Sequence, residues 1–201
     1  MHHMLTITRT LFQKETLEAL CFHRCGSYVI EQLAKLFNML LQFQQLDMKT
    51  RYTVIQLSQQ LNKLCSRLLS HFIESPFANH VLRQVLLSPE CDVSTPLFQL
   101  VEESWADDPK KCGLLSILFK QEALCTTFLG EHSDCINTWA RSKTASFLVE
   151  SIITHCNESS LKSLVKLFKH LEYNDFSLFC LKPLIRRLGN SALYRLSLIH
   201  I

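Results

Sequence analysis

Glycine and proline are scarce in this chain, with four glycines and five prolines among 201 residues. Both residue types mark turns, so their rarity argues against the many short connections of an all-β fold. Long stretches of alternating apolar and polar residues, which would indicate strands, are also lacking. Apolar residues instead recur at steps of three and four in 57–68 and 161–171, which is typical of amphipathic helices. We therefore expect an all-α fold, with Asp134, Asn157 and Asn174 as helix N-caps.

Long apolar runs and a strong charge of one sign are lacking as well. No uncharged run approaches the roughly 18 residues of a membrane-spanning helix, so we expect no membrane partner. The net charge is +3 with neutral histidines, which is low for a protein held mainly by phosphates. Binding of single strands by base stacking needs fewer cations. Two interpretations remain open for the basic residues near the motifs described below, phosphate contacts or solvated surface charges: His23, Arg24, Arg141, Lys143, Arg186 and Arg187.

Catalytic and metal-binding patterns are absent despite nine cysteines. The cysteines are scattered through helical patterns and odd in number, which indicates buried, reduced thiols. The segment Cys21–Cys25 resembles half a zinc site, but no second pair has ligand spacing, and Cys125, His132 and Cys135 are too loosely spaced. No nucleophile has a partner at a recognisable spacing. We predict a protein that is not an enzyme and has no metal, cofactor or small-molecule substrate.

One pattern does recur: a small residue, then Ser or Asn, then a ring, two aliphatic residues, and Glu or Arg. Its copies are 26–31, 78–83 and 145–150. On a helix, residues i and i+4 are neighbours, and i+1 is rotated by about 100°. Two polar groups flanked by a ring could read the edge of one RNA base and stack on it. The candidate RNA-binding residues are Ser27, Tyr28, Glu31, Asn79, His80, Arg83, Ser146, Phe147 and Glu150.

The spacing of the copies indicates a helical repeat. Asn79 and Ser146 are separated by two steps of roughly 33 residues each, a length typical of helical repeats. A degenerate copy is expected near position 113, where the reading residues are absent. A further copy near 178 adds Phe179 as a ring and Lys182 in the Glu or Arg position. The marks at 79, 113, 146 and 178 thus recur at nearly equal intervals, which is typical of a solenoid whose units bury their apolar faces by stacking.

The first interval is irregular. The step from Ser27 to Asn79 is longer than one repeat and shorter than two, and the Gln-rich segment near 40–53 predicts an insertion. We expect one repeat domain over 1–195 that is incomplete at its C-terminal end, because no capping repeat is evident. The last six residues, 196–201, resemble a translated sequencing adaptor and are expected to be non-native. The expected repeats are near 10–45, 46–94, 95–128, 129–160 and 161–195.

At these motifs the chain resembles the Pumilio (PUF) repeat superfamily, and within it the nucleolar pumilio-repeat protein family of small-subunit ribosome assembly. The segment Cys21–Glu31 is similar to that family's HRCG repeat. Phe77–Leu87 is similar to the repeat that follows, which also carries Arg where a typical PUF repeat has Gln or Glu. Ser146–Glu150 and Leu178–Lys182 follow in the order of later repeats. The likeness spans roughly residues 18–190.

The resemblance implies a right-handed, armadillo-like α-solenoid that binds precursor ribosomal RNA in its concave groove, in the nucleus and nucleolus. Pre-ribosomal assembly factors would be further partners. In the superfamily, Ser with Glu implies a preference for guanine, which Ser27 with Glu31 and Ser146 with Glu150 match. Arg83 departs from that pattern, so the resemblance implies relaxed sequence specificity.

Other interpretations stay open at this stage. Phe147 and Phe179 could be core residues, because rings at helical spacing often are. Ser27, Asn79 and Ser146 could simply be helix-start residues, with Glu31 and Glu150 as ordinary surface acids. A HEAT- or armadillo-like scaffold that binds a protein segment would use similar helices. A cytoplasmic Pumilio-type mRNA regulator would require regular reading pairs in most repeats.

Overall fold

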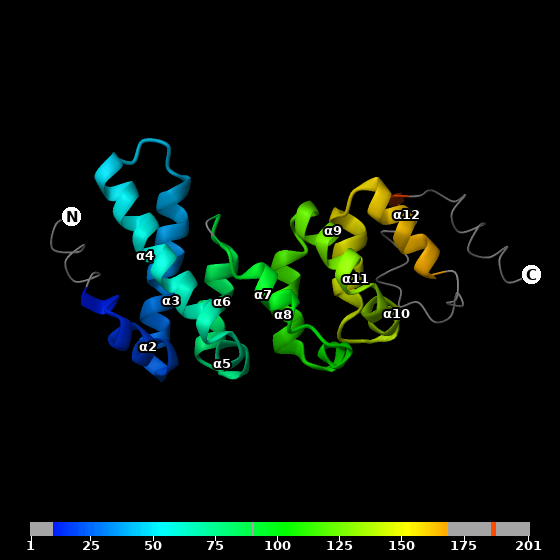
Figure 1. The fold of residues 1–201 in the computed structure, drawn as a ribbon, viewed down its shortest axis with the longest axis horizontal. Coiled ribbons are helices and arrows are strands. Elements are labelled where there is room, and N and C mark those ends of the chain that lie inside the picture. Colours follow the sequence, from blue (N-terminus) through cyan, green and yellow to red (C-terminus); the bar gives the residue numbers. More distant parts are fainter. Residues whose placement is uncertain (1–9, 90, 169–185, 188–201) are drawn as a thin grey trace, which may run out of the picture. The chain divides into compact units, whose positions relative to one another are not determined.

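The computed structural model describes residues 10–89, 91–168 and 186–187 (Figure 1). Within these ranges every regular element is helical, so the predicted all-α fold class is confirmed. Phe179, Lys182 and the segment 196–201 lie outside the described residues. The elements are α2 (Lys14–Phe22), α3 (Arg24–Gln42), α4 (Met48–Arg67), α5 (Leu69–Glu74), α6 (Ala78–Leu86), α7 (Ser94–Phe98), η1 (Glu103–Asp107), α8 (Pro109–Leu118), α9 (Glu122–Glu131), α10 (Ser133–Arg141), α11 (Ser146–His155) and α12 (Glu158–Leu167).

The chain forms two compact units, which we call unit 1 (residues 1–97) and unit 2 (98–201). Unit 1 contains α2 to α6, and unit 2 contains η1 and α8 to α12. The division falls close to position 94, where the sequence predicts the end of the second repeat.

In unit 1, the long helices α3 and α4 lie side by side, and α2 and α6 pack against α3 (Figure 1). The apolar stripe predicted over 57–68 faces this core, since Leu57, Leu61 and Leu64 are buried. Asp47 begins α4, because its carboxylate accepts a hydrogen bond from the Thr50 amide at 2.9 Å. Hydrogen bonds from Thr50 also lower the pKa of Asp47.

The segment expected as an insertion, 40–53, lies at the tip of this hairpin. Only positions 43–47 connect the two helices, and the rest of the segment is helical. α3 has 19 residues, whereas the helices that carry the later copies of the motif, α6 and α11, have 9 and 10. The extra length therefore lies mainly in the two helices, and its large apolar side chains, such as Phe43 and Met48, are exposed.

Unit 2 is built around aromatic side chains. The ring of Phe128 lies 4.7 Å from that of Phe119 and 5.3 Å from those of Phe98 and Trp139, measured between centroids. All four rings are buried. The indole Nε1 of Trp139 donates to the Glu103 carbonyl at 3.3 Å, so its polar group is satisfied at the edge of the cluster. This cluster joins α8, α9 and α10 across short connections.

Two of the predicted N-caps lie in the described part of unit 2. Asn157 caps α12, and its side chain accepts from the Ser160 amide at 2.8 Å, which confirms the prediction. The prediction for Asp134 is wrong, because α10 starts one residue earlier, at Ser133, and is preceded by His132. None of the described helices combines the length and the apolar composition needed to cross a membrane.

Candidate nucleic-acid interface

The three helices that carry the recurring motif start with the same capping geometry. His23 precedes α3, Ser75 precedes α6 and Ser142 precedes α11. In each case the side chain accepts hydrogen bonds of 3.1–3.3 Å from the amides two and three residues later. These bonds satisfy amides that have no partner inside the helix. Each capping residue lies four positions before the Ser or Asn of its motif.

Asp108 begins α8 in the same way, accepting from the Lys110 amide at 2.8 Å and the Lys111 amide at 3.3 Å. The capping positions 75, 108 and 142 therefore recur at nearly equal intervals, while the first interval, from 23 to 75, is longer. Measured from this cap, the degenerate copy is centred on Cys112, one residue before the position 113 that the sequence pattern indicates. The two positions differ by one residue because α8 lacks the motif residues, so the sequence pattern locates this copy only by spacing, whereas the cap locates the start of the helix directly.

A small residue lies three positions after the cap in each motif, as Gly26, Ala78 and Ala145, and all three are buried. Gly26 shows the cause. A Cβ atom on it would lie 2.7 Å from the carbonyl oxygen of Leu20, closer than such atoms approach. The start of α3 therefore passes tightly against the end of α2, which excludes larger side chains.

The Ser or Asn that follows is also buried. Ser27, Asn79 and Ser146 are at most 5% exposed. The Ser27 hydroxyl donates to the Arg24 carbonyl at 3.2 Å. The Asn79 amide nitrogen donates to the Ile73 carbonyl at 3.2 Å, and its side-chain oxygen accepts from Nε of Arg83 at 3.0 Å. These polar groups already have partners within the protein, and the last bond places the i and i+4 residues of one motif in contact.

The ring residues point the other way. Tyr28 is 64% exposed and Phe147 is 38% exposed, and the imidazole of His80 is exposed as well. The reason is the rotation of about 100° per residue, which takes the ring out of the packed face occupied by its neighbour. The last residue of each motif, Glu31, Arg83 or Glu150, is half-buried between the packed face and the exposed face of its helix.

The motifs fall into two groups. In unit 1, α3 and α6 pack together, and the Asn38 side chain donates to the Gln84 carbonyl at 2.8 Å, so the motifs at 27–31 and 79–83 lie on neighbouring helices. In unit 2, α11 packs on α8, where the Ser151 hydroxyl donates to the Phe119 carbonyl at 3.3 Å. The motif at 146–150 therefore has the degenerate helix α8 as its neighbour.

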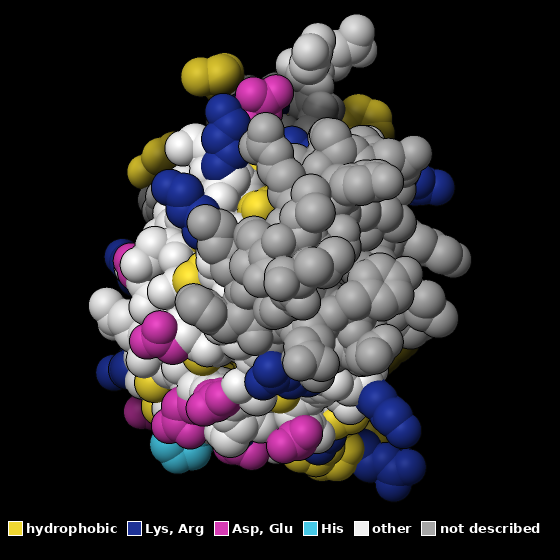
Figure 2. Space-filling view, turned by 90° about the vertical axis from the view of Figure 1, so that its right-hand side faces the viewer, with side chains coloured by type: hydrophobic (Ala, Val, Ile, Leu, Met, Phe, Trp, Pro, Cys, Tyr) yellow, Lys and Arg dark blue, Asp and Glu magenta, His cyan; other side chains and the backbone are white. Residues whose placement is uncertain are grey.

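Basic side chains near the motifs have different environments. Arg24, Arg141 and Lys143 are exposed close to the starts of α3 and α11. Arg187 instead binds within the protein: its guanidinium donates to the carbonyls of Ile153 at 2.8 Å and Cys156 at 2.6 Å, at the end of α11. It thus satisfies backbone carbonyls that the helix leaves open. Where Figure 2 shows described residues, around the grey area, Lys and Arg lie next to Asp and Glu.

The cysteines show no sign of a metal site, since no three His, Cys, Asp or Glu side chains in the described residues lie close enough to hold an ion. Seven of the eight described cysteines are buried or half-buried, and Cys25 alone among them is exposed. Burial raises the pKa of Cys21 and Cys125 to about 12 and that of Cys112 to about 11. These thiols are therefore protonated at neutral pH.

We expect the difference in burial between Cys25 and the other described cysteines to control how fast each thiol is alkylated. With iodoacetamide at neutral pH, Cys25 should react first among the described cysteines, because it is exposed, and Cys21 and Cys125 should react at least about tenfold more slowly, because they are buried and the thiolate is the nucleophile. Peptide mass spectrometry over time measures this, with urea-unfolded protein as the control in which the rates converge. Equal rates for Cys21 and Cys25 in the native protein would contradict the burial described here.

Comparison with known proteins finds no matching family model, no matching curated protein and no matching solved structure. The likeness to PUF repeats therefore depends on the motif residues and their spacing. Sequence reasoning located the three motif helices, but it missed the capping residues Ser75, Asp108 and Ser142. Their signal was available as a Ser or Asp that recurs with the same period as the motif.

Proposed function

We propose that this chain is an RNA-binding protein of PUF-like repeats that holds single-stranded or structured precursor ribosomal RNA during maturation of the small ribosomal subunit, in the nucleolus. The observation that supports RNA binding most directly is the exposure of Tyr28, His80 and Phe147, each one residue after a buried polar residue. Exposed rings offer stacking platforms for unpaired bases, and those of Tyr28 and His80 lie on the neighbouring helices α3 and α6.

In this mechanism the rings carry most of the base contact. Glu31 and Glu150 are half-buried beside them and can accept hydrogen bonds from the N–H groups of guanine. Arg83 can donate to a phosphate or to an acceptor on a base. Ser27 and Asn79 are already hydrogen-bonded within the protein, so they would add little to sequence reading. The expected result is affinity with relaxed specificity.

We propose that the repeats of this chain stack as a solenoid. Its support is the regular recurrence of capped helices, with caps at 75, 108 and 142 that are nearly evenly spaced. Right-handedness and a concave RNA-binding groove follow from the resemblance to PUF repeats. The ribosomal role, the assembly-factor partners and the nucleolar location rest on the same resemblance, carried by Cys21–Glu31 and Phe77–Leu87.

The alternative is an armadillo-like scaffold that binds a protein segment. The internal hydrogen bonds of Asn79 and Ser27 favour it, because a scaffold requires no free reading groups at these positions. It offers no explanation for an exposed ring at the same offset in each motif. A cytoplasmic mRNA regulator is less well supported, since α8 carries Cys112, Gly113 and Ser116 where such a protein needs a ring between two reading residues.

The double substitution Tyr28→Ala/Phe147→Ala tests the proposal. Base stacking on a ring contributes about 1–3 kcal/mol, so losing one ring should raise the Kd for single-stranded RNA with spaced guanines roughly 5- to 150-fold, and losing both should raise it further. Fluorescence anisotropy of residues 1–195 with labelled RNA measures this, and a duplex of the same length is the specificity control.

The matched control is Tyr52→Ala, which removes an exposed ring from α4, outside the motifs. Its Kd should equal that of the unchanged protein. If the double variant is helical and binds RNA as tightly as the unchanged protein, the rings do not stack on bases. Absence of single-strand binding by the unchanged protein would favour the scaffold.

A further inference from the structure

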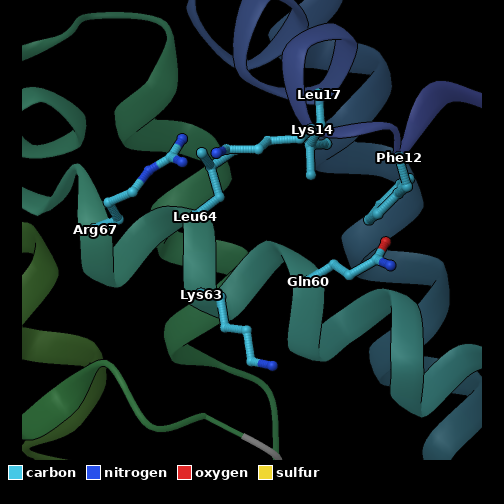
Figure 3. A pocket seen from close by; sticks show the side chains of 7 residues that line it. All are labelled: Phe12, Lys14, Leu17, Gln60, Lys63, Leu64 and Arg67. Carbon is cyan, nitrogen blue, oxygen red and sulfur yellow. The ribbon is translucent and has the colours of Figure 1, made fainter.

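Unit 1 has a groove between the start of α2 and helix α4. None of the residues that line it belongs to a copy of the recurring motif. One hollow of about 310 Å³ has an apolar floor of Phe12, Leu17 and Leu64 (Figure 3). A second, of about 390 Å³, adjoins it along α4 and shares Phe12, Lys14 and Gln60. We call the two hollows together the α2–α4 groove. Its α4 side spans Thr53 to Arg67, a length of about 21 Å.

The rim of the groove is basic. Its charged lining residues are Lys14, Lys63 and Arg67, and no Asp or Glu among the described residues lines either hollow, although Glu18 lies close enough to pair with Arg67. In Figure 3, Lys14 and Arg67 extend toward each other above Leu64, and Lys63 projects on the other side of α4. Arg67 binds Glu18 at 2.5 Å, whereas the ammonium groups of Lys14 and Lys63 have no ion pair or hydrogen bond within the described residues.

The rest of α4 has the same character. The helix contains no Asp or Glu over its 20 residues. Met48 is 82% exposed, and Tyr52 is also exposed, one helical turn further along. With Gln56, Gln60 and Lys63 these side chains form one exposed stripe at steps of three or four residues, which leads into the groove. This stripe is apolar at Met48 and Tyr52, carries neutral amides in its middle and ends at the cation of Lys63, and an exposed stripe of this length matches the face of a second helix.

These features select the chemistry of the occupant. An apolar floor accepts an aliphatic or aromatic anchor, and Lys14 and Lys63, which have no ion pair within the described residues, favour carboxylates around that anchor. A nucleic acid fits less well, because the one ring of the groove, Phe12, is only 4% exposed and cannot act as a stacking platform. We propose that the α2–α4 groove binds an acidic, amphipathic helix of a partner protein, with an apolar side chain in the hollow over Leu64.

The proposal is independent of RNA binding and is tested with the full chain. The probe is a fluorescein-labelled helical peptide with leucine along one face and glutamate elsewhere. Two comparison peptides replace every glutamate by lysine or every leucine by serine. We expect saturable binding of the acidic peptide, weakened at high salt, and at least about tenfold weaker binding of both comparison peptides.

The variant Lys14→Glu/Lys63→Glu should weaken binding of the acidic peptide at least about fivefold, because it turns two attractions into repulsions. Both lysines are exposed, and an acid at the first position of α2 suits the helix dipole, so folding is preserved. The matched control is Lys110→Glu/Lys162→Glu, which makes the same charge change at exposed lysines of α8 and α12. Its affinity should stay within about twofold of the unchanged protein.

Three results would overturn the proposal: no saturable binding of the acidic peptide, equal binding of the lysine peptide, or equal loss in the two charge-reversed variants. A fourth measurement, the affinity of the variants for single-stranded RNA, distinguishes this proposal from the proposed RNA-binding function. If Lys14→Glu/Lys63→Glu lowers the affinity for single-stranded RNA and leaves peptide binding unchanged, the groove is an RNA contact. If Tyr28→Ala/Phe147→Ala abolishes RNA binding alone, both proposals stand separately.

Discussion

Replacing Phe128 by alanine should destabilise unit 2 by about 3–5 kcal/mol, the usual cost of removing a buried phenylalanine ring. Phe128 is fully buried, and its ring contacts those of Phe98, Phe119 and Trp139. These neighbours come from different elements and are held by their own helices, so they cannot collapse fully into the space. Since a domain is stable by only about 5–15 kcal/mol, the loss would be a large part of the total.

The two tryptophans make this measurable for unit 2 alone. Trp105 and Trp139 are the only tryptophans of the chain, and both lie in unit 2. Urea unfolding followed by tryptophan fluorescence therefore reports on this unit. The matched control is Phe147→Ala, which removes the same side chain from an exposed position of α11 and should cost less than about 1 kcal/mol. Equal costs at the two positions would contradict the burial of Phe128.

Replacing Gly26 by alanine should destabilise unit 1, although alanine favours helices. The new Cβ would lie 2.7 Å from the Leu20 carbonyl oxygen and 3.0 Å from its Cα, so backbone must move. Overpacking of this kind costs about 1–3 kcal/mol, against a gain of about 0.5–1 kcal/mol from helix propensity. The net effect is a loss. Hydrogen exchange in peptides that cover α2 and α3 should accelerate accordingly.

Gly130 is the matched control, because it lies within α9 and a Cβ there would have no neighbour within 4 Å. Gly130→Ala should therefore be neutral or stabilise unit 2, by up to about 1 kcal/mol. Opposite signs for the two glycines would establish that the tight passage of α3 over Leu20 explains the small residue of the motif. Stabilisation by both substitutions would exclude that explanation.

The same tight passage bears on the recurring motif as a whole. Its small residue and its polar residue serve the packing of the helix start, as the contacts of Gly26 and Asn79 show. Its ring contributes less to this packing, because Tyr28 is 64% exposed and Phe147 is 38% exposed. Of the three positions, the ring is thus the one that requires a functional explanation, and the proposed RNA contact depends on it more than on the residues that the sequence pattern emphasises.

The order of residues along the chain by itself determined where most of the helices form and which of their faces are buried. Apolar steps of three and four residues predicted the helices, with Leu57, Leu61 and Leu64 on a buried face, because helix periodicity is a local property. Asn157 was recognisable as a cap for the same reason, since a cap bonds only to the next turn. The recurrence of the motif likewise placed three helix starts to within a few residues.

Only the tertiary structure decided which of these residues have free polar groups and which surfaces lie together. Asn79 is only 4% exposed and its amide bonds to Ile73, because α3 and α5 pack on α6, and no sequence pattern reports that burial. The α2–α4 groove joins Phe12 and Lys14 to residues far along the chain, and Arg67 meets Glu18 across 49 positions. Such contacts depend on how the helices pack against one another, and that packing is determined by all the helices of a unit together. The sequence of any one segment determines where its helix begins and ends, but its neighbours determine what it exposes.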